Sequence, residues 1–119
     1  MTVPPLPPTS SRTERDLLGE LELPAGVLHG IHTARALANL PLAGRPVRAD
    51  LVRAYGAVKL ACLETNVELG HLPAEIVPAL RQACEELANG DLGAHVVVDA
   101  LQGGAGTSTN MNVNEVLAN

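Results

Sequence analysis

The chain has 119 residues, which is about the length of one domain. Apolar residues make up 46% of it, but Phe and Trp are absent and Tyr55 is the only aromatic residue. A core must therefore be built mainly from aliphatic side chains, which favours packed helices over a β-sandwich. The net charge of −5, without a cluster of Lys and Arg or an aromatic platform, argues against a nucleic-acid partner.

The cellular compartment can also be predicted from the sequence. No apolar run approaches the roughly 18 residues that span a bilayer, and the N-terminus lacks the basic-then-apolar layout of a signal peptide. The two cysteines, Cys62 and Cys84, fall on predicted helices, so we expect reduced core thiols rather than a disulfide. Together these features predict a cytoplasmic protein without a membrane partner.

The first 11 residues, MTVPPLPPTSS, are rich in proline and hydroxyl side chains. This composition predicts an extended, disordered tail over residues 1–11. The PxxP spacing from Pro4 to Pro7 also fits an SH3-type groove, although a solvated leader is the simpler interpretation.

After this tail, residues 12–26 mix charged residues with leucines. Glu and Leu alternate in the second half, which predicts a short strand or hairpin that ends at Pro24 and Gly26. A first short helix follows over 31–39, IHTARALAN, and Pro41 stops it.

The clearest helix is predicted over 50–69, with Asp50 as its N-cap and Gly70 as its C-terminal stop. Its apolar stripe consists of Leu51, Tyr55, Val58, Cys62, Thr65 and Leu69. A further helix covers 74–89, where Pro78 predicts a bend or a late start. Its apolar face consists of Ile76, Val77, Leu80, Ala83, Cys84 and Leu87. We interpret both stripes as packing in the core or between subunits.

A glycine-rich turn, GGAGTST, follows the apolar stretch HVVVDALQ, whose secondary structure the pattern does not decide. Its three glycines permit positive φ angles and let another molecule approach the backbone closely. The hydroxyl residues after them stand at the start of a last helix, which Ser108 or Thr109 can cap. The free N–H groups and the positive end of the helix dipole favour an anion there.

The guest of such a turn is a carboxylate or a phosphate. A Walker loop requires a lysine, which this turn lacks, and a dinucleotide fingerprint requires glycine where Thr109 stands. A carboxylate is therefore favoured over a phosphate, and a flexible turn that only caps the helix remains the alternative.

The stretch QGGAGTSTNMNVNEVLAN resembles the first signature region of the aspartase/fumarase superfamily. The segments RTERDLLGELELPAGVLHGIHTARALANLPL, VKLACLETNVELGHLP and ALRQACEELANG resemble the aspartase N-terminus, so the resemblance covers 12–119. It implies a mainly α fold, the N-terminal domain of the aspartase/fumarase fold with a small β element. The start of the central helix bundle would be truncated, and such an ending resembles a truncation, a split gene or a fragment.

Two differences, one at the glycine-rich turn and one near the N-terminus, favour the aspartate ammonia-lyases over the fumarases. Fumarases typically have Gly-Ser-Gly-Thr-Gln-Ser at the turn, where this chain has Gly-Ala-Gly-Thr-Ser-Thr from residue 104. Fumarases also tend to have Gln in place of His32. The chain departs from the family at Leu28 and His29, where a pair of tyrosines is usual.

The resemblance implies reversible elimination of ammonia from L-aspartate to give fumarate. The threonine that matches Thr107 contacts the substrate in the family, and the implied substrate-binding set is Gly106, Thr107, Ser108, Thr109 and Asn110. Oriented donors at this turn would stabilise the charge that develops on the substrate carboxylate. The family's motif also includes Asn112, Asn114 and Glu115, which equally suit the pinning of helix ends and subunit contacts.

No catalytic residue is expected in this segment. The family's serine base lies in a Gly-Ser-Ser loop followed by Met-Pro-x-Lys-x-Asn, which these residues lack, so the isolated segment is expected to be inactive. The remainder of a lyase chain would supply it, together with a helix bundle through which the family forms homotetramers. No metal or cofactor is expected either, because His29 and His32 have no evident third ligand; His32 is expected to orient local structure.

Two alternatives remain open. One is a class II fumarase fragment acting on malate and fumarate. The other is a non-catalytic helical interaction module derived from such an enzyme.

Overall fold

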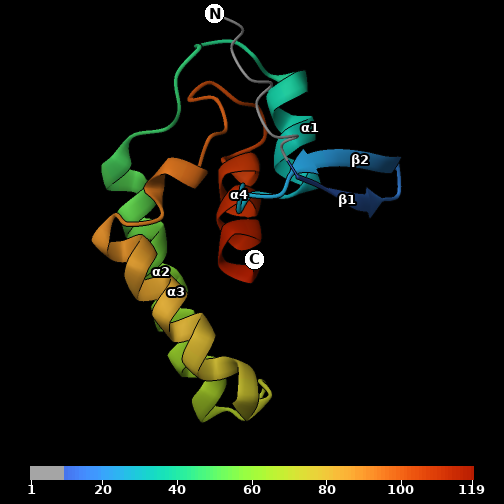
Figure 1. Ribbon diagram of the computed structural model, residues 1–119. Coiled ribbons are helices and arrows are strands. Elements are labelled where there is room, and N and C mark those ends of the chain that lie inside the picture. The colour runs from blue at the N-terminus through green and yellow to red at the C-terminus, as the bar shows by residue number, and fades with distance from the viewer. Residues whose placement is uncertain (1–9) are drawn as a thin grey trace, which may run out of the picture.

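The computed structural model describes residues 10–119, and within them the fold is mainly helical with one small sheet (Figure 1). In chain order the elements are β1 Ser11–Asp16, β2 Gly19–Pro24, α1 Ile31–Asn39, α2 Ala49–Glu68, η1 Ala74–Ile76, α3 Val77–Asn89, η2 Gly93–His95 and α4 Thr107–Ala118. The predicted fold class is confirmed, as are the hairpin and the helix over 31–39. The tail predicted over 1–11 lies outside the described residues except at its end, where Ser11 already belongs to β1.

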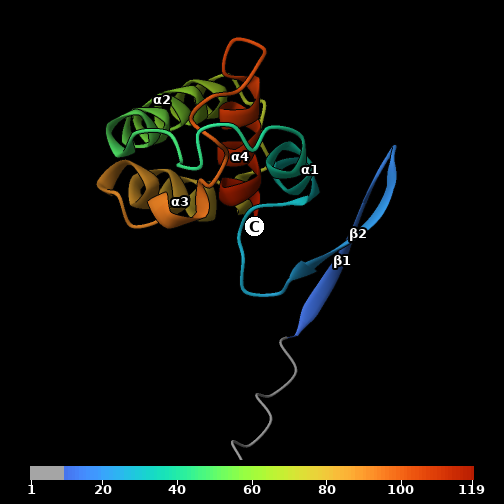
Figure 2. The same cartoon turned by 90° about the horizontal axis from the view of Figure 1, so that it is seen from above.

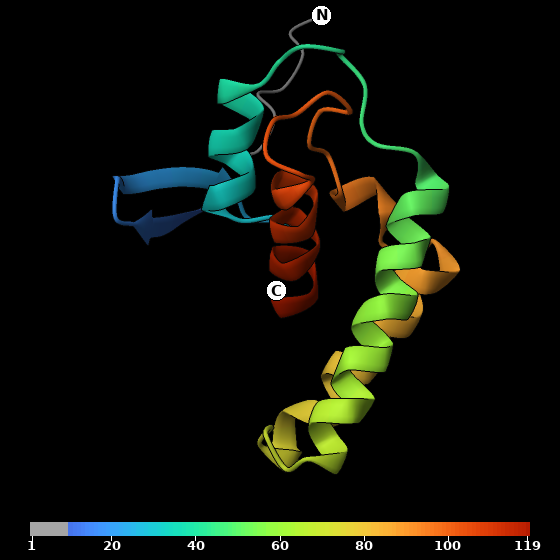
Figure 3. The same ribbon diagram turned by 180° about the vertical axis from the view of Figure 1, so that it is seen from behind.

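Helix α4 lies between two parts of the fold (Figures 1 and 3). On one side are α1 and the antiparallel β1–β2 hairpin, which projects away from the helices (Figure 2). On the other side α2 and α3 pair along their length and extend past the end of α4. The core is formed where these parts meet, by Val52, Leu87, Val96, Val113 and Val116.

Helices α2 and α3 approach each other closely at Gly56, which is buried. A Cβ at this position would lie 2.4 Å from the backbone nitrogen of Ala88 and 2.7 Å from its Cα atom. Only glycine therefore allows the two backbones to approach this closely.

The range predicted for α2 is confirmed to within one residue, but its predicted N-cap is wrong and most of its predicted apolar stripe lies outside the core. The N-cap is Arg48, without a side-chain cap, and Asp50 lies inside the first turn. The buried residues are Val52, Gly56 and Leu63, whereas most of the predicted stripe is exposed, as at Leu51 (48%), Val58 (57%) and Leu69 (62%). The face of α2 that contacts α3 is centred on Gly56, which permits close packing. A search for large apolar side chains at helical spacing does not find this face, because glycine has no side chain.

Helix α3 begins late, as Pro78 predicts. A short 3₁₀ turn precedes it, and the proline occupies the first turn, where its missing N–H has no helical acceptor in any case. Val77, Cys84 and Leu87 of the predicted face are buried. Both cysteines are free thiols, as expected, but Cys62 is exposed rather than in the core, and burial raises the pKa of the Cys84 thiol.

Two polar residues of α4 tie the fold together. Asn112 is fully buried, and its Oδ1 accepts hydrogen bonds from the backbone nitrogens of Val97 (2.8 Å) and Val98 (3.2 Å). Its Nδ2 donates to the carbonyl oxygen of His95 at 3.0 Å. The stretch after η2 is therefore held extended against α4, which decides the conformation that the sequence left open.

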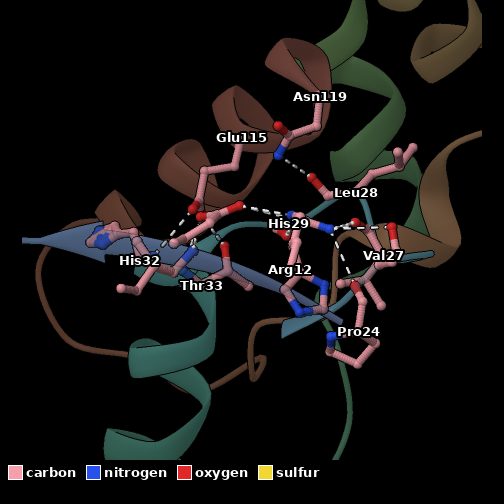
Figure 4. Close-up of polar contacts among 12 residues, drawn as sticks. Arg12, Pro24, Val27, Leu28, His29, His32, Thr33, Glu115 and Asn119 are labelled. Atoms are coloured by element: carbon pink, nitrogen blue, oxygen red, sulfur yellow. Dashed lines mark hydrogen bonds and ion pairs between the residues drawn. The ribbon is translucent and has the colours of Figure 1, made fainter. Parts of the chain in front are cut away.

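Glu115, one turn further along α4, caps α1 (Figure 4). Its carboxylate accepts hydrogen bonds from the backbone nitrogens of His32 (3.1 Å) and Thr33 (2.9 Å) and from the Thr33 hydroxyl. Glu14 of β1 accepts from the backbone nitrogen of Ile31 at 2.7 Å. The first three amides of α1 have no partner inside their own helix, and here two carboxylates bond all of them at the positive end of the dipole.

His32 and Arg12 also lie at the junction between α4, α1 and the hairpin. His32 takes part through its backbone amide, whereas its ring Nε2 is buried without a hydrogen bond. Arg12 donates to the carbonyl oxygens of Val27 (2.6 Å) and His29 (2.7 Å), which ties the hairpin to the segment before α1. Of the three motif residues, Glu115 pins a helix end and Asn112 holds the extended stretch after η2. Within residues 10–119, the side chain of Asn114 hydrogen-bonds only to Met111 of its own helix.

Replacing Glu115 with Ala should lower the free energy of unfolding by about 1–3 kcal/mol, because three donors at the start of α1 lose their acceptor. Glu115→Gln should cost less, since one acceptor oxygen remains. The measurement is urea unfolding followed by circular dichroism. Glu85→Ala, at an exposed position of α3, serves as the control and should change stability by less than about 0.5 kcal/mol. Equal stability of the Glu115 and Glu85 variants would contradict the capping role.

Candidate functional site

The glycine-rich turn has an unusual backbone. Three successive residues, Gly104, Ala105 and Gly106, adopt left-handed conformations with φ angles of 76°, 52° and 80°. Ala105 is the only non-glycine residue with a positive φ within residues 10–119. Glycine on both sides keeps the strain of this conformation to one residue.

Helix α4 begins directly after this turn, at Thr107, with Gly106 as its N-cap. The predicted capping by Ser108 or Thr109 is wrong, because both residues lie inside the helix. Gln102 caps the helix from outside: its Oε1 accepts from the backbone nitrogen of Thr109 (2.9 Å) and from the Thr109 hydroxyl (3.0 Å).

Gln102 also connects the turn to the segment before it. Its Nε2 donates to the carbonyl oxygen of Asp99 at 2.8 Å, so both ends of the amide are bonded. Sequence reasoning missed this residue, although it directly precedes the glycines of the motif. The available signal was a side chain with a hydrogen-bond acceptor, Gln102, directly before the glycines that lead into α4.

Asp99 fixes the start of this segment. Its side chain is 8% exposed, and its carboxylate accepts from the backbone nitrogens of Leu101 (2.8 Å), Ala43 and Gly44 (both 2.9 Å). These backbone donors, Leu101 foremost, lower the pKa of Asp99 below its ordinary value. The ionised carboxylate therefore holds the loop before α2 against the segment that leads into the turn.

The substrate-binding residues predicted from the sequence divide into two groups. Thr107 is exposed, and its hydroxyl and backbone nitrogen both donate to the Gly104 carbonyl oxygen, at 2.7 Å and 3.0 Å. Gly106, Ser108 and Asn110 are half-buried. Thr109 is only 3% exposed and its hydroxyl is bonded to Gln102, so its side chain supports the turn from inside.

The amides at the start of α4 are mostly occupied. Those of Thr107, Thr109 and Asn110 donate to Gly104, Gln102 and Gly106. The amide of Ser108 makes no hydrogen bond within the part of the chain that the structure describes. One backbone donor at the helix start therefore remains for a guest.

Helix α2 lies beside this turn, and this neighbourhood was not predicted from the sequence. The Tyr55 hydroxyl lies 3.8 Å from the point that a Cβ on Gly106 would occupy. One turn further along, Lys59 Nζ donates to Asn110 Oδ1 at 2.8 Å. The first turn of α4 is thus flanked by a phenol and an ammonium group.

The arrangement suits an anion with carboxylate chemistry. It offers an unpaired backbone amide, hydroxyl groups, a glycine that permits close approach and a nearby positive charge. Among residues 10–119, no group of three or more His, Cys, Asp or Glu side chains is placed to hold a metal ion. No helix within the same residues is long and apolar enough to span a bilayer.

Comparison with known proteins defines the class. The pattern of the protein family described as Lyase matches residues 19–119, including the hairpin's second strand, all the helices and the glycine turn. The chain belongs to this lyase family.

Individual relatives narrow the comparison. The chain is 51% identical over 115 residues to an aspartate ammonia-lyase from Pseudomonas aeruginosa, covering 95% of this chain and 24% of the relative. It is 44% identical over 110 residues to a class II fumarate hydratase from Thermus thermophilus, covering 91% and 24%. Among solved structures, the fumarate lyase:delta crystallin of Brucella melitensis matches with a TM-score of 0.89 and 43% identity, covering 92% of this chain and 24% of that one. The chain thus spans about a quarter of the length of the curated relatives that it matches.

Asp99→Asn should lower stability at neutral pH, and the deficit should shrink in acid. Because the folded pKa of Asp99 is lowered, its contribution is present above the unfolded pKa of about 3.9 and is lost as the pH falls through the folded value. Thermal midpoints of the wild type and the variant, measured from neutral pH to below pH 3, should therefore begin to converge as the pH falls below about 4 and should meet below the folded pKa of Asp99.

The matched control is Asp91→Asn, which changes an exposed carboxylate that makes no side-chain hydrogen bond within residues 10–119. Its midpoint should follow that of the wild type throughout. A deficit of Asp99→Asn that stays constant down to the lowest pH would contradict the role assigned to the carboxylate.

Proposed function

We propose that this chain is the N-terminal part of an aspartate ammonia-lyase, which reversibly eliminates ammonia from L-aspartate to give fumarate. The observation that carries the proposal is the identity of 51% to an aspartate ammonia-lyase over nearly the whole chain, against 44% to the class II fumarate hydratase. The cleaved bond is a carbon–nitrogen bond, and the products are fumarate and ammonia.

The turn from Gly104 to Asn110 binds one carboxylate of the substrate in this proposal. Removal of the proton beside the substrate's side-chain carboxylate places additional negative charge on its oxygens. Donors that are already oriented toward that charge lower the barrier, because they need not reorganise during the reaction. The Ser108 amide is such a donor, and the backbone around it is held by Gln102.

We propose that Thr107 contacts the substrate through its side-chain hydroxyl. Its hydroxyl donates to Gly104 in the free protein, and a rotation about χ1 redirects it toward a bound oxygen. Gly106 allows the ligand to approach the backbone, and Asn110 adds its side-chain amide as a further donor. Thr109 acts as support, since its hydroxyl is bonded to Gln102 inside the fold.

The remaining groups of the site come from elsewhere in the proposed enzyme. The resemblance to the family implies a serine base in a Gly-Ser-Ser loop and a homotetramer built through a central helix bundle. This segment therefore supplies one carboxylate-binding turn and no catalytic base. Its role is to present the donors of α4 in a fixed arrangement.

A class II fumarase is the second candidate, supported by the 44% identity to the fumarate hydratase. The two reactions share fumarate and differ in adding ammonia or water. Ala105 and Ser108 follow the aspartase pattern at the turn, which favours the ammonia-lyase.

The two candidates separate by substrate preference. The full-length protein should form fumarate from L-aspartate with a higher kcat/KM than from L-malate, monitored by the ultraviolet absorbance of fumarate. A higher value for malate would assign the fumarase function instead. Turnover of neither substrate would favour the non-catalytic helical module.

Thr107→Val tests the turn directly, because it keeps the β-branched shape and removes the hydroxyl. Loss of one oriented donor to the developing charge should reduce kcat by about 10²–10³ in the full-length protein. If the hydroxyl only closes the turn onto Gly104, the variant should instead lose about 1 kcal/mol of stability and retain its turnover. Turnover and thermal midpoint measured on the same preparation distinguish these outcomes, and a lower midpoint with near-normal turnover would contradict the binding role.

A further inference from the structure

Lys59 is the only lysine in the chain, and the predicted substrate-binding set does not include it. It lies on the face of α2 that meets the start of α4, four residues after Tyr55. Its Nζ donates to Asn110 Oδ1 at 2.8 Å. Within residues 10–119, all four ion pairs are formed by arginines, and no carboxylate lies at ion-pairing distance from Lys59.

The surroundings of Lys59 explain why its head group stands at this place. The residue helps to line a cavity of 220 Å³ between α2, α3 and α4, together with Leu63, Leu80, Cys84 and Leu117. An apolar lining suits the methylene groups of a lysine stem and leaves the ammonium at the polar edge. There the charge meets a neutral amide oxygen, so it remains available to a counter-ion.

We propose that Lys59 is a positioning residue of the carboxylate site, which fixes the amide of Asn110 so that its Nδ2 donates to the substrate. This inference rests on the proposed function and deepens it. An ammonium group has three donors and no acceptor, so only Oδ1 of Asn110 can face Lys59. The NH₂ group of the same amide must then point away from Lys59.

The free NH₂ group is open to a ligand. Asn110 Nδ2 makes no hydrogen bond within residues 10–119, and it is not among the buried atoms without a partner, so it reaches solvent. Asn110 follows Thr107 by three residues, which places both on the same side of α4. The amide dipole is also polarised by the ammonium on its oxygen, which strengthens its N–H groups as donors.

The decisive variant is Asn110→Asp in the full-length protein. An aspartate at this position would keep and strengthen the contact with Lys59, so the thermal midpoint should be unchanged or higher. It would also replace two donors with an acceptor oxygen facing the substrate. The KM for L-aspartate should therefore rise at least about tenfold, and the affinity for fumarate, measured by calorimetry, should fall by a similar factor.

Lys59 itself is tested by a pair of substitutions. Lys59→Met removes the ammonium and should raise KM about tenfold, with a smaller change in kcat. Lys59→Arg keeps a donor on the amide oxygen and should restore KM to within about threefold of the wild type. In the Asn110→Ala background, Lys59→Met should have little further effect, because the lysine acts through that amide.

Arg48→Met is the matched control, since it removes one positive charge from the start of the same helix, where the arginine side chain is 82% exposed. Its KM should equal that of the wild type. Wild-type affinity for fumarate in Asn110→Asp, or additive effects of the Lys59 and Asn110 substitutions, would overturn the proposal. If Lys59→Met does not fold, the Asn110→Asp and Lys59→Arg variants still decide it.

The binding measurement separates this inference from the proposed function. If the wild type turns over neither aspartate nor malate, the proposed function fails. Loss of fumarate affinity in Asn110→Asp at an undiminished midpoint would then still support the positioning role. A wild type that binds no fumarate would overturn both.

Discussion

The fold depends on hydrogen bonds that the side chains of α4 make to backbone groups of its two neighbours. Asn112 bonds the extended stretch at Val97 and Val98, and Glu115 bonds the first amides of α1. A buried amide group without a partner costs about as much as a lost hydrogen bond. The α1 amides lie at a helix start and those of Val97 and Val98 lie outside any helix or strand, so none of them has a partner within its own segment. The side chains of α4 therefore supply the hydrogen-bond acceptors for backbone amides that helices and strands leave without a partner.

This arrangement also places the candidate site. The glycine turn leads directly into α4, so the interactions that fix the helix also fix the direction of its first turn. At the other end of the glycine turn, the Asp99 carboxylate holds the preceding segment to the backbone of Ala43 and Gly44. Gln102 then links the Asp99 carbonyl oxygen to the Thr109 amide, so the turn is fixed on both sides. A left-handed run of three residues would be poorly defined alone. Held at both ends, it presents its amide and hydroxyl donors in one arrangement, which is what stabilisation of developing charge requires.

Features encoded by neighbouring residues could be predicted from the sequence. The alternation of Glu and Leu gives β2, Pro78 gives the late start of α3, and the resemblance of the last 18 residues to a signature region identifies the family. The buried face of α2 could not be predicted, because it is centred on Gly56 and on how closely the α3 backbone approaches. The cap of α4 could not be predicted either, since Gln102 reaches Thr109 only after the turn has formed. The Lys59–Asn110 contact joins residues 51 positions apart, and nothing local to either one indicates it.

The hydroxyl run of the motif shows why a sequence pattern and a site differ. Successive residues on a helix are rotated by about 100°, so Thr107, Ser108 and Thr109 cannot all face one ligand. The buried residues of α4 are Thr109, Asn112, Val113 and Val116, with the spacing of a core-facing stripe. Thr109 and Asn112 are polar, and their side chains form hydrogen bonds inside the fold. A search for apolar residues at helical spacing therefore does not find this stripe. Thr107 and Asn110 lie three residues apart on another side, where Asn110 contacts Lys59 of α2. The motif thus combines two periodic sets, one that fixes the helix in the fold and one that faces the site.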